Sequence, residues 1–461
     1  MLKIAVLADL HLPDELPSMH VKVLQEAVEC CVREKADVIV CAGDMAKADA
    51  FNAAKLLLDS LSSVPIPAVI TQGNTEQGIP GFDRMIADCG KFISPEVEIF
   101  NAETPLPGNR SGKFRILVGH WPLKELPANV DMQIAGHSHI DRSGNGIEVV
   151  RGLDPDKVIG GAPAVTFFTV SGNNCQRSEK VLPGFSVGEW SCLERAELLG
   201  QIGVSVKYDA EQELDRAIEL NIPAVEIIHT LTRNGATALA AGRYQQQTGG
   251  AISVHLPDIS FANPDAAVEA VKRGVDIGAE QFTLHVPKAT LSELADPADF
   301  ERMTDLFCKV LELAPQAVFG IENMHLVKNE TEFERRFGYT PLEQLKMIRE
   351  LRARLPQHRI GALLDIGHAR NNGVFYRKYS LAQWYDALRG NIVGMHLHQV
   401  TSDAEGYHNH TPVTGWYHRL ISLASFINEW RNGCFAGAKL FIECRGGWES
   451  SYAMFKQELS K

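Results

Sequence analysis

Short apolar segments recur through the first third of the chain, and each of them ends at an aspartate or a glycine. They cover residues 3–8, 37–42, 68–71, 114–118 and 132–135. Apolar positions at helical spacing lie between some of them, over residues 19–35 and 48–61. Short continuous apolar strands bounded by turn residues are typical of a sheet that is covered on both faces. The pattern predicts an α/β domain with its strands in the middle.

A second pattern begins near residue 200, where strand-like and helix-like segments alternate. The expected strands end near Val206, Ile228, His255, His285, Glu322, Asp365, His396 and Glu443. Helical patterns cover residues 211–220, 235–247, 264–276, 299–313, 341–355, 381–389, 417–431 and 450–459. About eight strand–helix units in about 260 residues predict a (β/α)8 TIM barrel. An open doubly wound sheet is the alternative, and it rarely has so many regular repeats.

The length of 461 residues fits two domains, because it exceeds one typical core. The stretch 171–180 is polar and aperiodic, and Leu182-Pro183-Gly184 follows it. Such polar, turn-rich stretches are typical of connections. We therefore expect a first domain over residues 1–172, a linker over residues 173–195 and a barrel over residues 196–461.

Composition narrows the class of protein further. The net charge is −12 and no cluster of lysine and arginine stands out, which weighs against tight nonspecific binding of duplex DNA. The nine cysteines form no Cys-x-x-Cys pair, which is typical of reduced thiols in a cytosol. Lys3 leads directly into an expected strand, so we expect no signal peptide, no membrane segment and a cytoplasmic location. A homo-oligomer is compatible with the sequence.

Five short motifs follow the strands of the first domain, in the order Asp9-Leu10-His11, Gly43-Asp44, Gly73-Asn74, Gly119-His120 and Gly136-His137-Ser138-His139. Together they supply seven oxygen or imidazole ligands, enough for two divalent metals that share one carboxylate. Such a pair can clamp a phosphate and turn a bridging water into a nucleophile at neutral pH. Glycine before most of these ligands lets the backbone turn sharply and approach the metals.

The set and its order resemble the calcineurin-like metallophosphoesterase family. The resemblance implies an αββα-type sandwich with two manganese, iron or zinc ions. The first metal would be bound by Asp9, His11, Asp44 and His139. The second would be bound by Asp44, Asn74, His120 and His137. Asp44 would bridge the two metals, and Asp44 and His120 would be catalytic.

One position departs from the family pattern. Family members often have a histidine after the Gly-Asn pair, and it helps to protonate the leaving group. Thr75 occupies that position here, followed by Glu76. A threonine is no general acid near neutral pH. We therefore expect a phosphodiesterase or an enzyme for activated esters, with loss of activity as the other interpretation.

Polar residues also gather at the expected strand ends of the barrel. They are Glu226, His255, His285, Glu322, Asp365 with His368, His396 with His398, and Glu443, and a loop after the seventh strand adds His408 and His410. The carboxyl ends of barrel strands form one face, where active sites lie. We therefore expect these side chains in one mouth. His398 is either a ligand or a neighbour of the ligands, and His229 and His325 are assigned no role.

The segments around these residues resemble the xylose-isomerase-like barrels. The matching pieces are Ser253-Val254-His255-Leu256-Pro257, Leu284-His285-Val286-Pro287, Ile321-Glu322-Asn323, Leu364-Asp365-Ile366-Gly367-His368-Ala369, Met395-His396-Leu397-His398, His408-Asn409-His410-Thr411-Pro412 and Ile442-Glu443. One branch of the family contains AP endonucleases of the endonuclease IV type. The other contains sugar and sugar-phosphate isomerases and epimerases.

The two branches imply different metal sites. In the endonuclease branch three zinc ions would be bound by His255, His285, Glu322, Asp365, His368, His396, His408, His410 and Glu443. His408 stands where that branch has an aspartate, which puts the third metal in question. In the isomerase branch one metal, often manganese, would be bound by Glu322, Asp365, His396 and Glu443. Glu322 and Glu443 would then also move the substrate proton, and His368 would hold a substrate oxygen.

Three hypotheses follow for the whole chain. In the first, both domains hydrolyse phosphate esters of nucleotides, nucleic acids or related small molecules, and the barrel resembles endonuclease IV. In the second, the barrel is a sugar or sugar-phosphate isomerase or epimerase coupled to the phosphoesterase. In the third, the barrel is a non-catalytic binding module. One to three zinc or manganese ions are expected in the barrel, so the metal count separates the first two.

Overall fold

The computed structural model describes residues 1–109, 111–157, 161–327, 330–331, 334–403, 406–418 and 420–460. The chain divides into two compact units. The first consists of Met1–Gly188 together with Trp416–Asn428, and the second consists of Glu189–Gly415 together with Glu429–Lys461. Strands and helices build both units, which confirms the predicted α/β class.

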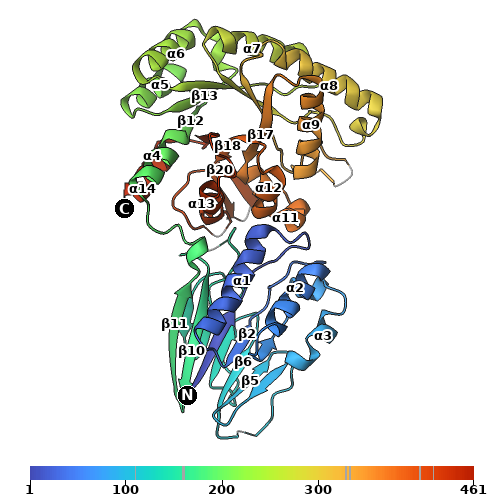
Figure 1. The fold of residues 1–461 in the computed structure, drawn as a ribbon, viewed down its shortest axis with the longest axis vertical. Helices are drawn as coiled ribbons and strands as arrows, with labels where there is room; N and C mark the ends of the chain where they lie inside the picture. The colour runs from blue at the N-terminus through green and yellow to red at the C-terminus, as the bar shows by residue number, and fades with distance from the viewer. Residues whose placement is uncertain are drawn as a thin grey trace. The chain divides into compact units, whose positions relative to one another are not determined.

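Two β-sheets form the first unit (Figure 1). The first sheet has the order β11-β10-β1-β2-β3, with strands β1 (Leu2–Leu7), β2 (Val38–Cys41), β3 (Ala68–Ile70), β10 (Ala164–Ser171) and β11 (Asn174–Val181). The second has the order β4-β5-β6-β7-β9-β8, with strands β4 (Lys91–Ile93), β5 (Val97–Asn101), β6 (Phe114–Val118), β7 (Met132–Ala135), β8 (Arg142–Gly144) and β9 (Ile147–Val149). Strands β1 to β3 run parallel, and so do β5 to β7. Their carboxyl ends therefore lie at one edge of each sheet.

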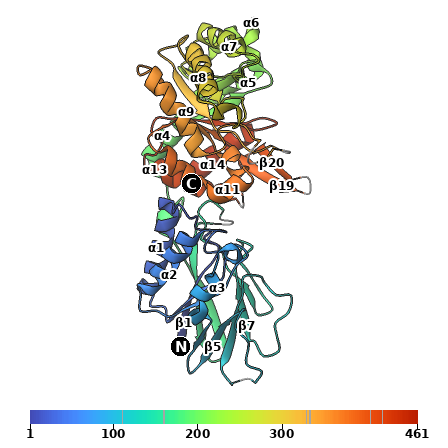
Figure 2. The same ribbon diagram turned by 90° about the vertical axis from the view of Figure 1, so that its right-hand side faces the viewer.

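The core of this unit joins alternate residues of both sheets. Ile4 and Val6 of β1 and Val38 and Val40 of β2 belong to one cluster of buried side chains. The cluster continues through the second sheet, with Val97, Ile99, Ile116, Val118, Met132 and Ile134. Helices α1 (Ser18–Arg33) and α2 (Phe51–Ser62) cover the other face of the five-stranded sheet (Figures 1 and 2). Successive side chains of a strand point to opposite faces of its sheet. Alternate residues therefore face the core between the two sheets, and the others face the helices.

Loops cover the six-stranded sheet around Arg115, in place of the second helical layer of an αββα sandwich. In the described part of the chain no α-helix joins β5 to β6 or β6 to β7. Arg115 is only 2% exposed, and its guanidinium donates to Glu98 at 2.9 and 3.0 Å. It also donates to the carbonyl oxygens of Pro107, Asn109 and Asn129. A single buried cation therefore fastens two loops to the sheet.

Replacing Arg115 with methionine is expected to lower the free energy of unfolding of the first unit by about 3–5 kcal/mol. The reason is that the variant leaves the buried Glu98 carboxylate without a counter-charge. Urea unfolding followed by circular dichroism measures this effect. The double variant with Glu98→Met removes both charges, and we expect it to recover most of the loss. A single variant as stable as the wild type would contradict a stabilising role for the pair.

The structure corrects the predicted linker, residues 173–195. Strand β11 lies within it and pairs antiparallel with β10, from Ser171 opposite Asn174 to Ala164 opposite Val181. Helix α4 (Cys192–Gln201) also begins there, after a capping box between Ser191 and Glu194. As an edge strand, β11 exposes much of its length, so its polar composition resembled a loop. The first domain therefore extends beyond residue 172.

The second unit is a closed barrel of eight strands, as predicted. They are β12 (Ile202–Val206), β13 (Ala224–Ile228), β14 (Ala251–His255), β15 (Gln281–His285), β16 (Val318–Glu322), β17 (Arg359–Asp365), β18 (Ile392–Leu397) and β21 (Lys439–Ile442). All neighbouring pairs are parallel. Every strand ends within about one residue of its predicted end, which places the polar strand-end residues at a common rim.

Helices follow the strands close to the predicted places. They are α5 (Ala210–Glu219), α6 (Gly235–Thr248), α7 (Asp265–Asp276), α8 (Pro297–Leu311), α9 (Pro341–Arg354), α12 (Leu381–Leu388), α13 (Leu423–Arg431) and α14 (Glu449–Ser460). Helix α13 begins six residues after its predicted start, and its residues up to Asn428 belong to the first unit. The structure adds the short helices α10 (Ile366–Arg370) and α11 (Val374–Lys378), and a hairpin of β19 (Gln399–Asp403) and β20 (Gly406–Thr411). Among the described residues, no helix is both long enough and apolar enough to span a bilayer.

Candidate metal centres

The predicted ligands of the first unit follow the carboxyl ends of β1, β2, β3, β6 and β7. The structure brings their donor atoms into two groups, each with its atoms within 4.8 Å of one another. The first group consists of Asp9, His11 and His139, and the second consists of Asp44, His120 and His137. Asn74 adjoins the second group, because its Oδ1 lies 3.0 Å from His120 Nε2. All seven residues therefore meet where the two sheets end.

The backbone at these residues is unusual. Eleven non-glycine residues in the described part of the chain have a positive φ. Five of them are the predicted ligands Asp9, His11, Asp44, His137 and His139 of the first unit, with φ between 49° and 69°. Left-handed backbone costs of order 1–3 kcal/mol at a residue other than glycine, and it gathers at functional sites. The strain independently marks these residues as a site.

Two glycines allow the strand ends to approach each other. A Cβ on Gly73 would lie 2.1 Å from Asp44 Oδ1, and one on Gly43 would lie 2.8 Å from His120 Nδ1. Gly43 also has a φ of +83°. No side chain fits at either position without moving a predicted ligand. Glycine before the ligand is therefore required here by close packing, as the sequence indicated.

The first group has the properties of an incomplete cation site. His11 Nε2 and His139 Nε2 face each other at 3.3 Å. Burial lowers the pKa of His139 to about 4, so this ring is neutral at pH 7, the form that binds metals. Burial also raises the pKa of the Asp9 carboxyl to about 8. A divalent cation between these donors would compensate the buried carboxylate and use both imidazole lone pairs.

The second group is oriented by a backbone carbonyl. His120 Nδ1 lies 3.1 Å from Ala42 O and donates to it, so its Nε2 keeps the lone pair. That lone pair faces His137 Nδ1 at 3.1 Å, Asn74 Oδ1 at 3.0 Å and Asp44 Oδ2 at 3.4 Å. Four atoms of the kinds that bind metals therefore converge here. The arrangement fits a second cation, with the other nitrogen of His120 held as metal-binding histidines usually are.

Thr75 and Glu76 hold Asp44 in place. The backbone amide of Thr75 donates to Asp44 Oδ1 at 2.9 Å, and the Thr75 hydroxyl lies equally close to it. The buried Glu76 carboxylate accepts from the amides of Asp44, Gly73 and Ala46 at 2.8–2.9 Å. Burial raises the pKa of Glu76 to about 7. Thr75 is therefore turned toward the Asp44 carboxylate.

In the barrel, a cavity of about 280 Å³ opens at the carboxyl ends of the strands. Predicted residues line it, namely His255, His285, Glu322, His368, His410 and Glu443. Asp365 and His396 are fully buried beside them. Sequence reasoning missed Lys207, whose Nζ lies 2.5 Å from Glu443 Oε1 and which also lines the cavity. Its position directly after β12 is the signal that could have identified it.

His396 provides the clearest test of whether a metal fits the barrel. Its Nε2 lies 2.7 Å from Glu226 Oε2 and donates to that carboxylate, which leaves the lone pair on Nδ1. Nδ1 faces Glu443 Oε2 at 3.1 Å, Glu322 Oε1 at 3.3 Å and Asp365 Oδ2 at 3.7 Å. It has no hydrogen-bond partner. Three carboxylates around an imidazole nitrogen are a set of ligands that fits a divalent cation.

A second donor group meets the other oxygen of Glu322. His255 Nε2 lies 3.1 Å and His285 Nε2 lies 3.5 Å from Glu322 Oε2. The Nδ1 of His285 donates to Asp258 at 2.8 Å, a carboxylate that sequence reasoning did not select. The Nδ1 of His255 lies 3.2 Å from the carbonyl of Leu256. Both rings therefore turn Nε2 toward Glu322, which lies between two donor groups.

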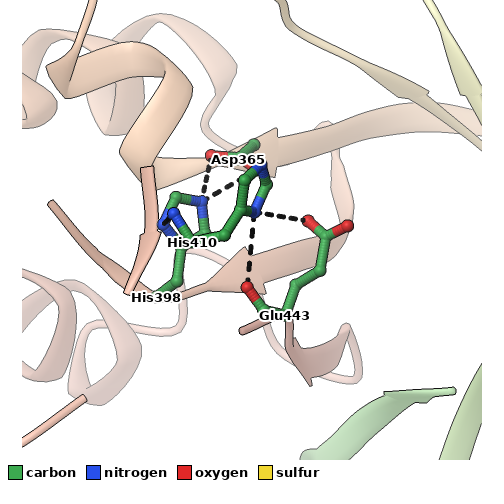
Figure 3. A group of neighbouring side chains, drawn as sticks. All are labelled: Asp365, His398, His410 and Glu443. Atoms are coloured by element: carbon green, nitrogen blue, oxygen red, sulfur yellow. Dashed lines mark hydrogen bonds and ion pairs between the residues drawn. The ribbon is translucent and has the colours of Figure 1, made fainter. Parts of the chain in front are cut away.

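A third group contains Asp365, His398, His410 and Glu443 (Figure 3). The amide of His410 can only donate, and it donates to His398 Nδ1 at 2.9 Å. The carbonyl oxygen of Gln399 lies 3.0 Å from the same nitrogen. The other ring nitrogen, Nε2, lies 3.0 Å from Asp365 Oδ1, so His398 packs against the Asp365 carboxylate.

Two predicted residues remain, His368 in the cavity and His408 on the hairpin. His368 Nδ1 lies 3.4 Å from Glu322 and 3.6 Å from Asp365. Burial lowers the pKa of His368, but these carboxylates raise it to about 9. His408 lies on the hairpin, where its Nε2 is 2.9 Å from Asp403 Oδ2. The structure thus gives His408 a carboxylate partner of its own, where the endonuclease branch implied a ligand.

Two family models match the chain. Residues 214–458 match the model of the xylose isomerase-like TIM barrel, and residues 2–141 match the model of the calcineurin-like phosphoesterase. The first match covers more than half of the chain. No curated protein matches the chain significantly.

Several solved structures are similar to parts of the chain. A D-tagatose 3-epimerase-like protein is 17% identical over 56% of this chain and 96% of its own, with a TM-score of 0.43. An AP endonuclease of family 2 from Brucella melitensis is 14% identical over 56% and 97%, with a TM-score of 0.40. A dimetal phosphatase from Danio rerio is 14% identical over 39% and 99%, with a TM-score of 0.28. The assignment of both domains rests on the family models.

Proposed function

The chain belongs to the xylose isomerase-like TIM barrel family and carries a calcineurin-like phosphoesterase domain ahead of the barrel, and from this premise we propose a metal-dependent hydrolase with two active sites. In the N-terminal domain the activity is that of a dinuclear phosphodiesterase. The two adjoining groups of donors, Asp9 with His11 and His139 and Asp44 with His120 and His137, support this activity. Manganese, iron and zinc all suit such mixed carboxylate and imidazole ligands.

The metals and the residues of this site have separate roles in the proposed reaction. Two bound divalent metals supply a Lewis acid for the phosphoryl oxygens and lower the pKa of a water molecule. Asp44 would hold both metals and supply negative charge to them. Asn74 and His120 would hold the second metal together with His137. Thr75 holds Asp44 and gives no proton to the leaving group, so the leaving group departs without a general acid at this position.

The N-terminal site is therefore expected to prefer diesters and activated esters over alkyl phosphate monoesters. General acid help is typically worth about 10²–10⁴-fold, and poor leaving groups need it most. The measurement is kcat/KM for methyl p-nitrophenyl phosphate against methyl phosphate, with equal metal loading. A higher value on the alkyl monoester than on the diester would refute the proposed phosphodiesterase.

In the barrel we propose hydrolysis of phosphate esters as well, in the manner of endonuclease IV-type enzymes. The observation that carries this proposal is the position of Glu322, with one oxygen toward His396 and the other toward His255 and His285. A carboxylate shared by two donor groups suits a site with two or more zinc ions. Such sites clamp both the attacking and the leaving oxygen of a phosphate ester.

The alternative function is that of a sugar or sugar-phosphate isomerase or epimerase. Glu322, Asp365, His396 and Glu443 also form a complete single-metal site, where His368 and Lys207 would hold substrate oxygens. That reaction has no use for the second group, in which Asp258 orients His285. The extra group therefore favours hydrolysis. A non-catalytic binding module is disfavoured for the same reason.

A small phosphate ester is the better substrate for the barrel than a nucleic acid. The cavity of about 280 Å³ suits a ligand of sugar-phosphate or mononucleotide size. The net charge of −12 opposes the approach of a duplex. Lys207 provides a positive charge inside the cavity, where a phosphate or a departing oxygen would lie.

A further inference from the structure

One tryptophan of this chain differs from all the others. The six tryptophans all lie in the described part, and five of them, Trp190, Trp384, Trp416, Trp430 and Trp448, are at most 7% exposed. Trp121 is 53% exposed. A large aromatic side chain in water loses the free energy that its burial would contribute. Its exposure therefore needs a reason, and its position supplies one.

Trp121 lies at the N-terminal metal centre. It directly follows His120, and its ring centroid is 3.6 Å from that of His137 and 5.4 Å from that of His120. Both histidines belong to the second group of donors. An exposed indole that touches the metal-binding residues borders the place where a phosphate ester would react.

The backbone that carries this indole is held in place. The side-chain amide of Gln133, on β7, is buried and donates to the carbonyl of Trp121 at 2.8 Å. The Gln133 side-chain oxygen accepts from the amide of Leu123 at 2.8 Å. One glutamine thus fixes both ends of the three-residue segment, and Pro122 restricts its middle. The indole is presented on a rigid support, as a preformed stacking surface requires.

We propose that Trp121 is the stacking surface for an aromatic ring of the substrate, and that this ring is a nucleobase. The substrate of the N-terminal site is then a nucleotide ester, bound by its phosphate at the metals and by its base on Trp121. This inference rests on the proposed phosphodiesterase function of the same site. Stacking of one base on an aromatic side chain typically contributes about tenfold or more in affinity.

The competing explanation is that Trp121 only holds His137 in position. Under that explanation its loss would affect all ligands of the site alike. Under the proposal, its loss weakens only ligands that carry a base. AMP and ribose 5-phosphate are the matched probes, because they share a phosphate and a ribose and differ in the adenine.

The experiment measures both compounds as competitive inhibitors of methyl p-nitrophenyl phosphate hydrolysis by the full-length, metal-loaded protein. We expect AMP to inhibit the wild type about tenfold more tightly than ribose 5-phosphate. Trp121→Ala should bring the two inhibition constants together, while Trp121→Phe should keep most of the difference. An equal preference in wild type and Trp121→Ala, or no preference in the wild type, overturns the proposal.

Fluorescence provides a readout that does not depend on turnover. AMP should quench part of the tryptophan emission of the wild type, whereas ribose 5-phosphate should not. Trp121→Phe should abolish that quenching, because the five other tryptophans are buried. Quenching that persists in Trp121→Phe contradicts stacking on Trp121. A wild type that shows the quenching but cleaves no diester refutes the phosphodiesterase function and leaves the base-binding surface in place.

Discussion

The Asp44→Ala variant is expected to lose phosphoesterase activity by about 10³-fold or more, since even one charge-stabilising group in an active site is commonly worth about 10²–10³. Asp44 Oδ2 lies 3.4 Å from His120 Nε2, and its Oδ1 accepts from Thr75. The alanine removes a negative charge from between two cations. Their mutual repulsion then goes uncompensated, so both metals should bind less tightly.

The measurement combines hydrolysis of bis-p-nitrophenyl phosphate with the metal content per chain from mass spectrometry. Asp83→Ala is the matched control, because Asp83 is an exposed aspartate on the short helix α3 (Phe82–Met85). It should leave activity and metal content unchanged. Full activity in Asp44→Ala would exclude a dinuclear centre at this position. A loss of activity with unchanged metal content would make Asp44 a catalytic group and not a ligand.

The Glu322→Gln variant is expected to empty the barrel of about two metal ions per chain while the phosphoesterase stays active. Glu322 is 1% exposed, and its two oxygens face different donor groups. Glutamine has the same shape as glutamate, but it has one oxygen and one NH₂ group in place of the two carboxylate oxygens. The NH₂ group removes a ligand oxygen from one donor group, and the neutral amide oxygen that faces the other binds a cation more weakly than a carboxylate, so both groups lose affinity.

The metal content of this variant separates the two functions proposed for the barrel. A loss of two ions supports the hydrolase, and a loss of one supports the single-metal isomerase. Glu312→Gln, at an exposed glutamate just after α8, makes the same chemical change outside the site and serves as the control. If phosphoesterase activity falls together with barrel metal content, the two sites are not independent.

The strand ends were predictable because the sequence marks them twice, by the end of an apolar run and by the polar residue or glycine that follows it. At Glu322, for example, an apolar run of strand length ends at a single ionisable residue, and β16 ends there in the structure. In the first domain, the Gly43-Asp44 pair gave both a turn and a ligand, and the structure shows why the glycine is needed. Such signals are local, so one sequence suffices to read them.

The contacts between strands were not predictable in this way. Lys207 follows β12 and meets Glu443 beyond β21, a pairing that exists only once the barrel closes. His398 Nδ1 meets the amide of His410 only because the hairpin brings that amide to it. The same hairpin brings His408 to Asp403, and no local sequence pattern predicted this pair. Strand β11 was missed because an exposed edge strand has the composition of a loop.

The left-handed backbone at five of the ligands has a consequence for how the protein matures. Short unfolded peptides seldom adopt that conformation at aspartate or histidine, so the nascent chain holds no ready chelate. The ligands acquire their geometry only after β1, β2, β6 and β7 have paired, and these strands come from two sheets. We therefore expect metal insertion into the N-terminal domain to follow folding. Here the order is the reverse of that in a zinc finger, whose metal drives folding.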